Sequence, residues 1–209
     1  MIIAVDGPTA SGKGTIARAL AAHFHLPVLD TGMLYRAVGY QTQLNHGDPD
    51  NAADALAACD FPSRLLEDPA LRYESTGSLA SRVSVHPEVR RALLQRQVDF
   101  ANQVGGAVLD GRDIGTVIAP HADAKLFVTA RPEERARRRQ AEMLGRGVEV
   151  SYDAVLADVH ARDARDTGRA DAPLLRAEDA LLLDNSDMGV DEAIAAAIAF
   201  VTEKVRQPG

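Results

Sequence analysis

A glycine-rich segment near the start of the chain combines one lysine with small and hydroxylated residues. It reads Gly7-Pro8-Thr9-Ala10-Ser11-Gly12-Lys13-Gly14-Thr15, between the apolar run 1–5 and a helix-like stretch 16–24. In a strand, loop and helix of this order, backbone N–H groups cradle phosphate oxygens. The helix N-terminus and the Lys13 ammonium add positive charge there. The segment therefore predicts a nucleoside triphosphate site, whereas an ordinary strand-to-helix turn would need no lysine at that position.

The end of this segment departs from the general phosphate-loop pattern. Gly14 follows Lys13, and the hydroxyl group comes one residue later, at Thr15. In the general pattern the residue after the lysine carries the hydroxyl that touches Mg²⁺, so direct ligation of the metal by Thr15 is left open. Because Gly14 has no Cβ, we expect it to leave room for a second substrate. Gly-Lys-Gly-Thr resembles the version found in nucleoside monophosphate kinases.

Charged residues also follow a later apolar run, at 107–109. Asp110 comes first, and Arg112 and Asp113 lie just beyond it. In a protein with a phosphate-binding loop, a carboxylate at the end of an apolar strand commonly faces the metal–nucleotide. We therefore expect Asp110 to face the triphosphate, with Arg112 and Asp113 within reach of the same crevice. A capped turn with a surface ion pair is the structural alternative.

Two further segments carry arginines at suggestive positions. Arg36 lies about one turn into the helix predicted after Leu29-Asp30-Thr31, and the helix alone does not decide whether it is functional. Arg162, Asp166 and Arg169 recur at spacings of four and three, so in a helix they share one face. That face fits either a solvated set of ion pairs or a surface that reads a sugar, a base and a phosphate.

Composition narrows the function classes. The 209 residues are 46% hydrophobic and 25% charged, with a net charge of −7, which argues against a general nucleic-acid binder. Nine of the arginines fall between Arg131 and Arg169, and guanidinium groups suit phosphate recognition. One cysteine, Cys59, excludes an internal disulfide and a cysteine zinc cage. With no long apolar run and no signal-peptide pattern, we expect a cytoplasmic protein without membrane or nucleic-acid partners.

Apolar runs alternate with helical patterns along the chain, which predicts an α/β fold with helices on both faces of a parallel sheet of about five strands. The buried strands are predicted at residues 2–5, 28–29, 107–109, 126–129 and 180–183. Residues 60–82 carry Pro62, Pro69 and Gly77 and predict an irregular or small β insertion. Residues 131–169 are charged and helical, and we expect them to move over the substrates.

Four motifs in order now make a family resemblance specific. They are the segment 7–15, Leu29-Asp30-Thr31-Gly32-Met33-Leu34-Tyr35-Arg36, Asp110-Gly111-Arg112-Asp113-Ile114-Gly115-Thr116 and Arg162-Asp163-Ala164-Arg165-Asp166-Thr167-Gly168-Arg169. The chain resembles the bacterial type of cytidylate kinase over nearly its whole length. The resemblance implies transfer of a phosphoryl group from ATP to CMP or dCMP, with Mg²⁺. We expect the protein to be a monomer.

The resemblance also implies a single three-layer P-loop kinase domain over residues 1–209. Its core would be 1–30, 105–130 and 170–209, with a monophosphate-binding region at about 31–104 and a lid at about 131–169. The segment at 60–82 is shorter than the β-rich insertion of many relatives, which leaves the CMP-versus-dCMP preference open.

Site residues are carried over by motif. The ATP phosphates would be held by Gly7, Pro8, Thr9, Ala10, Ser11, Gly12, Lys13, Gly14 and Thr15. CMP would be held by Thr31, Arg36, Ser81, Arg90, Arg112, Asp113, Arg162, Asp166 and Arg169. The resemblance selects Arg90 rather than Arg91, a choice that the spacing alone leaves open. Catalysis would fall to Lys13, Arg112 and the lid arginine Arg135, which has Arg138 and Arg139 as neighbours. We expect ATP phosphates and water to hold Mg²⁺, near Thr15 and Asp110.

Four other functions compare with this one. A purely structural or regulatory binder would bind ATP without phosphoryl transfer. Another P-loop kinase could act on a different monophosphate, or on a hydroxyl compound such as shikimate. The latter should have a carboxylate pair after the second strand, where Asp30-Thr31-Gly32 offers one carboxylate. A nucleotide-binding switch protein should carry a guanine-reading Asn-Lys-x-Asp motif, which the sequence lacks.

Overall fold

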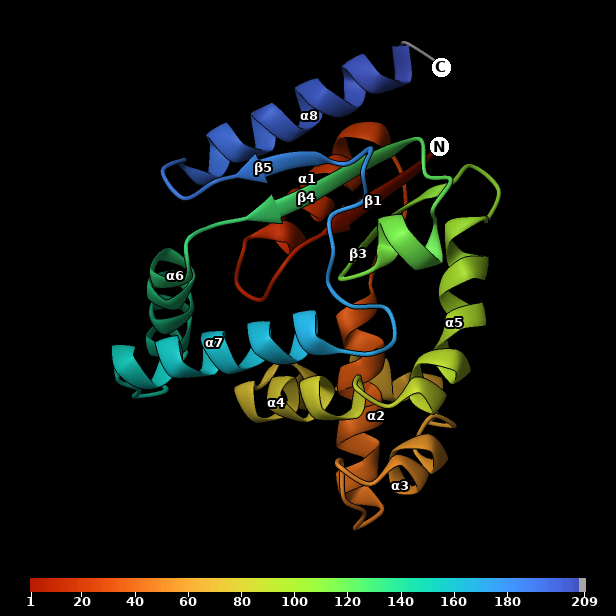
Figure 1. Ribbon diagram of the computed structural model, residues 1–209, viewed down its shortest axis with the longest axis vertical. Helices are drawn as coiled ribbons and strands as arrows, with labels where there is room; N and C mark the ends of the chain where they lie inside the picture. Colours follow the sequence, from red (N-terminus) through yellow and green to blue (C-terminus); the bar gives the residue numbers. More distant parts are fainter. Residues whose placement is uncertain (207–209) are drawn as a thin grey trace. The chain divides into compact units, whose positions relative to one another are not determined.

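The computed structural model describes residues 1–206 (Figure 1). The chain divides into two compact units. The first unit comprises residues 1–29 and the chain from Ala101 onward, and the second comprises residues 30–100. The last three residues of the predicted core segment 170–209 lie outside the described part.

A five-stranded parallel sheet is the centre of the first unit. The strands are β1 (Ile2–Asp6), β2 (Val28–Asp30), β3 (Ala107–Gly111), β4 (Ala124–Thr129) and β5 (Leu181–Asp184). Their order is β2-β3-β1-β4-β5, with Val5 opposite both Asp110 of β3 and Leu126 of β4. The predicted parallel α/β sheet is confirmed. The expectation of burial is wrong for β2 and β5, where Val28 and Leu182 are exposed, because both strands lie at the edges.

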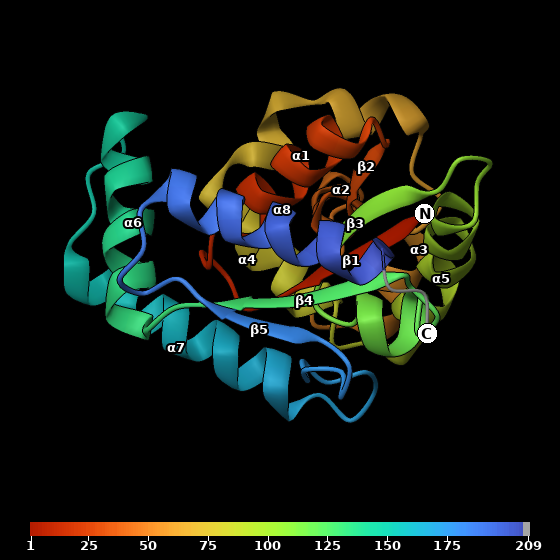
Figure 2. The ribbon, with the colours of Figure 1, turned by 90° about the horizontal axis from the view of Figure 1, so that it is seen from above.

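Alternation along β1 directs its side chains to two different layers. Ile3 and Val5 join the apolar core under α1 (Lys13–Phe24) and α8 (Val190–Arg206), the helices seen across the sheet in Figure 2. Asp6 instead accepts hydrogen bonds from the first two residues of a π-helical segment, Ile114–Ile118. The helix α1 begins at Lys13, so the end of the phosphate-loop segment forms the first helical turn.

The charged segment 131–169 folds as a helical hairpin. It consists of α6 (Pro132–Gly145) and α7 (Tyr152–Gly168), which share a small apolar core around Ala136, Val155 and Val159. Pro132 begins α6, and the Ser151 hydroxyl caps α7 by accepting from the N–H of Ala154. The prediction that Arg169 shares a helical face with Arg162 and Asp166 is wrong, because α7 ends at Gly168 and Arg169 is extended.

The second unit is helical throughout its regular structure. Its elements are α2 (Thr31–Leu44), α3 (Ala52–Ala57), two 3₁₀ turns at Ser63–Glu67 and Pro69–Arg72, α4 (Glu74–Val83) and α5 (Pro87–Ala101), whose last residue belongs to the first unit. The predicted irregular or β insertion at 60–82 is wrong. Pro69 opens the second 3₁₀ turn and Asp68 caps it by accepting from the N–H of Ala70, so these residues start turns of helix.

Candidate active site

The phosphate-loop segment connects β1 to α1 at the carboxyl end of the sheet. Gly7 is required there, because a Cβ at this position would lie 2.0 Å from the backbone oxygen of Val128. The Gly12 carbonyl accepts from the N–H groups of Thr15 and Ile16 and so starts α1. The remaining N–H groups at this helix start are suited to binding an anion.

Lys13 and Asp110 lie side by side beneath this loop. The Lys13 Nζ donates to the Pro8 carbonyl at 3.4 Å and lies 3.9 Å from Oδ1 of Asp110. A Cβ built on Gly14 would lie 2.9 Å from Oδ2 of Asp110. The missing side chain of Gly14 therefore makes room for the Asp110 carboxylate, whereas the sequence suggested that this space would serve a second substrate.

Asp6 supports the segment that carries Arg112 and Asp113. Its two carboxylate oxygens accept from the N–H groups of Ile114 and Gly115, each at 2.8 Å. Burial raises the pKa of Asp6 to about 7, even though these two hydrogen bonds favour the charged form. The nearby charges of Asp113 and Asp110 raise it further.

Arg112 and Asp166 form the ion pair that brings two predicted CMP-binding motifs together. Arg112 Nε donates to Oδ2 of Asp166 at 2.7 Å, with the Asp166 side chain buried. Burial by itself would raise the pKa of Asp166, but Arg112, Arg169 and Lys13 together hold it below its usual value. The positive charge of Lys13 therefore acts on the carboxylate of the Arg112–Asp166 pair. Arg162, one turn before Asp166, pairs with Asp158 at 2.7 Å.

Arg135 joins the helical hairpin to the phosphate loop. Its buried guanidinium donates to the Thr9 carbonyl at 3.2 Å, to the Ala130 carbonyl at 2.9 Å and to both oxygens of Asp163. In this arrangement Arg135 contacts the backbone of the loop and is held in place by Asp163. Asp163 was not among the predicted site residues, because its partner is 28 residues away and the spacing gave no sign of the pair.

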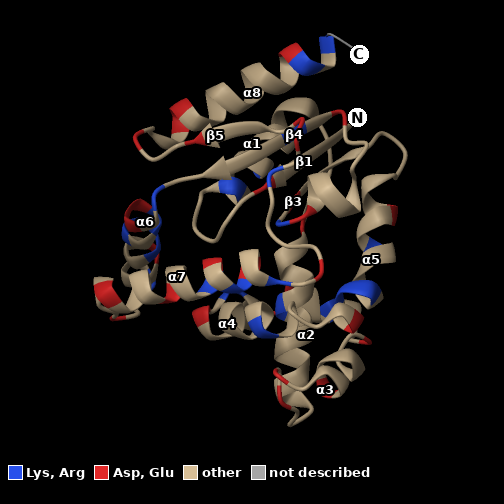
Figure 3. Ribbon diagram, viewed as in Figure 1, with Lys and Arg blue, Asp and Glu red and all other residues tan. Residues whose placement is uncertain are grey.

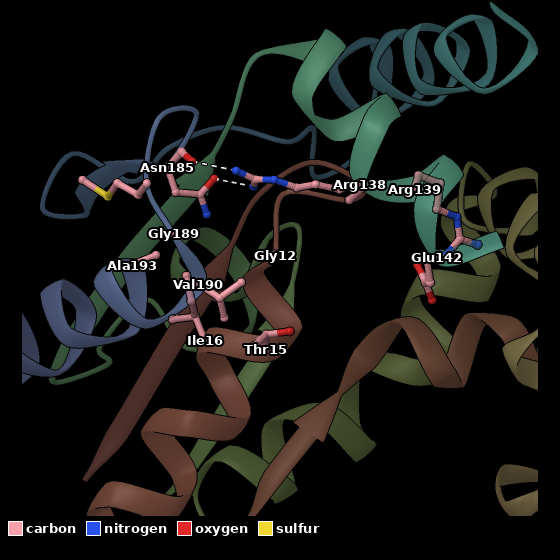
Figure 4. Close-up of a pocket in the computed structure, with 12 residues that line it drawn as sticks. Gly12, Thr15, Ile16, Arg138, Arg139, Glu142, Asn185, Gly189, Val190 and Ala193 are labelled. Carbon is pink, nitrogen blue, oxygen red and sulfur yellow. Dashed lines mark hydrogen bonds and ion pairs between the residues drawn. The ribbon is translucent and has the colours of Figure 1, made fainter. Parts of the chain in front are cut away.

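A pocket of about 320 Å³ opens beside the phosphate loop (Figure 4). Its walls come from the loop and the start of α1, from α6, and from the segment after β5 together with the start of α8. The lining residues are Ala10, Gly12, Thr15, Ile16, Arg138, Arg139, Glu142, Asn185, Met188, Gly189, Val190 and Ala193. Apolar groups dominate the floor, and Arg138 and Arg139 stand at the α6 side. The sequence identified the phosphate loop and the arginines of α6, whereas no motif marked the segment 185–190.

The remaining predicted residues lie in the second unit. Thr31 is the first residue of α2 and Ser81 lies on α4. Arg36 donates to the carbonyls of Leu71 and Tyr73 at 2.8 and 3.0 Å. The guanidinium carbon of Arg90 lies 5.8 Å from the centre of the Tyr35 ring, a cation–π contact.

Comparison with known proteins decides the family. The model of the family described as cytidylate kinase matches residues 3–203. The chain belongs to the cytidylate kinase family. It is similar to a cytidylate kinase from Xanthobacter autotrophicus, with 56% identity over 96% of this chain and 97% of that protein. A cytidylate kinase from Caulobacter vibrioides is 54% identical over 97% of this chain and 95% of its own length.

Among solved structures, the chain is similar in fold to an uncharacterized protein from Eubacterium ventriosum. The TM-score is 0.57 at 15% identity, covering 97% of this chain and 98% of the other. None of the helices described in residues 1–206 is both long and apolar enough to cross a membrane.

Proposed function

We propose that this protein transfers the γ-phosphoryl group of ATP to CMP or dCMP and releases ADP with CDP or dCDP. The observation that supports this most is the convergence of Lys13, Asp110, Arg112 and Asp166 beside the phosphate loop, in a member of the cytidylate kinase family. The loop and Lys13 suit a triphosphate, and Arg112 suits the phosphate of a second nucleotide.

The reaction needs little acid–base chemistry. The attacking atom is a phosphate oxygen that is already anionic near neutral pH, so no side chain has to remove a proton. Catalysis then rests on holding donor and acceptor in line and on neutralising the charge of the transferred group. Lys13 is proposed to supply charge on the donor side and Arg112 on the acceptor side, with Arg135 fixing the loop through its contact with Thr9.

Mg²⁺ is proposed as the metal that accompanies ATP. The residues present fit this role, because the Asp110 carboxylate lies against Gly14 and close to Lys13, with the Thr15 hydroxyl one residue further along. A bound Mg²⁺ would offset the negative charge of the triphosphate. We expect the phosphates and water to supply most of its ligands.

CMP recognition is proposed to divide among nine residues. Arg36 and Arg112 would hold the CMP phosphate. The pyrimidine would be recognised by Thr31, Arg90, Asp113 and Arg169, and the ribose by Ser81, Arg162 and Asp166. The buried charge of Arg162 and Asp166 supports roles in polar recognition, since such groups need polar partners.

The pocket beside the loop is proposed to take the nucleoside part of ATP. Its volume of about 320 Å³ falls within the usual range of ligand pockets, on the order of 300–1,000 Å³. Its apolar floor suits a flat base, and it opens next to Gly12 and Thr15 of the phosphate loop. We further propose that the protein acts as a monomer in the cytoplasm, without nucleic-acid or membrane partners.

An ADP-release assay with CMP, dCMP, UMP, AMP and GMP as acceptors tests the proposal. CMP and dCMP should give the highest kcat/KM, and a preference for AMP or GMP would overturn the assignment. Replacement of Lys13 by Met should lower kcat by roughly 10²–10³-fold, the scale for a group that neutralises transition-state charge. Lys204→Met, at an exposed position in α8, is the matched control and should keep wild-type activity.

A further inference from the structure

Asn185 is a buried polar residue that no motif of the chain identifies. It follows β5 directly and is 3% exposed. Its side-chain N–H donates to the Ser11 carbonyl of the phosphate loop at 2.9 Å. Its backbone N–H donates to the Thr129 carbonyl at the end of β4, also at 2.9 Å. The residue is therefore fixed to the sheet and reaches the middle of the loop.

The other end of the Asn185 amide faces α6. Arg138 Nη1 donates to its side-chain oxygen at 2.8 Å and Nη2 donates to its backbone oxygen at 2.7 Å (Figure 4). This two-point contact sets the orientation of the amide. With the oxygen held by Arg138, the NH₂ group must point toward Ser11, and only a side chain with both a donor and an acceptor can make these contacts.

We infer that Asn185 is a positioning residue that couples the wall of the ATP pocket to the conformation of the phosphate loop. Asn185 and Arg138 both line that pocket, whereas Ser11 belongs to the loop that would hold the phosphates. Arg138 orients the Asn185 amide, and this amide in turn fixes the Ser11 carbonyl. The orientation of that carbonyl determines where the adjacent N–H groups of the loop point. This inference rests on the proposed function, because it assigns the loop and the pocket to one ATP molecule.

The coupling has a specific kinetic consequence. A loop that loses the Ser11 contact should bind and orient ATP less well, while CMP affinity stays close to its original value. A residue with a merely structural role would instead lower protein stability and affect both substrates together. The KM for ATP, the KM for CMP and kcat therefore distinguish the two roles.

The test uses the substitution Asn185→Asp, which keeps the shape and replaces the donor by an oxygen. Asp still accepts from Arg138, but it sets a carboxylate oxygen against the Ser11 carbonyl. We expect kcat/KM for ATP to fall by about ten- to a hundredfold, the scale for an unsatisfied buried hydrogen-bonding group. The KM for CMP should stay within about twofold. Should N185D fail to fold, calorimetric binding of ATP and CMP to Asn185→Ala distinguishes the positioning role from the merely structural one.

Asp187→Asn is the matched control. Asp187 lies on the same segment and pairs with Arg131 ahead of α6, but this pair is exposed and lies outside the pocket lining. Its loss should change kcat/KM for ATP by less than about twofold, as is usual for exposed ion pairs.

A double-mutant cycle of Asn185→Ala and Arg138→Met tests the coupling itself. If Arg138 acts through Asn185, the double variant should lose less ATP affinity than the product of the two single losses. Strictly multiplicative losses would overturn the inference, as would an N185D enzyme with wild-type kcat/KM for ATP or equal losses for ATP and CMP. A wild-type enzyme that releases no ADP with CMP would instead reject the proposed function.

Discussion

Arg112 is held by a buried carboxylate and is also a proposed ligand of the CMP phosphate. Its pair with Asp166 measures 2.7 Å and leaves the Arg112 side chain 25% exposed. A guanidinium held in this way is already oriented, so it would lose little conformational freedom on binding a phosphate.

Replacement of Arg112 by Met should therefore affect both catalysis and stability. We expect kcat/KM for CMP to fall by about a hundredfold or more, because charge-assisted hydrogen bonds to the phosphate are lost. Asp166 would also lose its ion pair, so unfolding should become easier by roughly 1–3 kcal/mol. Steady-state kinetics and thermal melting measure the two effects. A fall in melting temperature with unchanged kinetics would reject the catalytic role, and Arg91→Met, at an exposed side chain, should show neither effect.

The hairpin of α6 and α7 is an element with little apolar core and many ion pairs. Arg135 and Asp163 form its most buried pair, which also ties α6 to Thr9. Replacement of Asp163 by Asn should destabilise the hairpin by about 1–3 kcal/mol, because the Arg135 guanidinium would lose a charged partner in a buried place. Hydrogen exchange of the α6 and α7 amides should accelerate, with smaller changes in the sheet.

The pair of Arg137 with Glu134 in α6 offers a control, because Arg137 is 62% exposed whereas Arg135 is buried. Glu134→Gln should leave the exchange rates of the hairpin nearly unchanged, as exposed ion pairs contribute about 0–1 kcal/mol. Equal acceleration in both variants would show that the Arg135–Asp163 pair has no special role.

The sequence predicted elements far better than it predicted contacts between side chains. The five strands were found because each apolar run of Val, Ile and Leu ends at a polar residue. The segment 60–82 was misread because its prolines suggested irregular structure, although Pro69 suits the first position of a helical turn. The partners Asp163 and Asn185 could not be found, because their contacts depend on how distant segments pack.

For the whole molecule, Asp6 makes folding stability depend on pH. Its pKa rises from 3.8 to about 7 on folding, so between these values the folded protein holds a proton that the unfolded chain has lost. The stability contributed by this difference is complete below about pH 4 and is lost as pH rises toward 7. The slope is at most roughly 1.4 kcal/mol per pH unit.

Replacement of Asp6 by Asn removes this titration and serves as its test. The melting temperature of wild type minus that of D6N should fall as pH rises from 5 to about 7. A difference that stays constant over this range would show that Asp6 does not titrate there. Circular dichroism at several pH values measures both proteins under identical conditions.

Of the 23 Lys and Arg residues, three are lysines and the others are arginines. Figure 3 shows Lys and Arg together in blue along the ribbon. The primary amines on side chains are those of Lys13, Lys125 and Lys204. Lys125 is buried between Asp179 and the Pro120 carbonyl, and Lys204 is exposed on α8. Mild acylating reagents should therefore find few targets on this enzyme, and among its lysines only Lys13 would link acylation to a loss of catalysis.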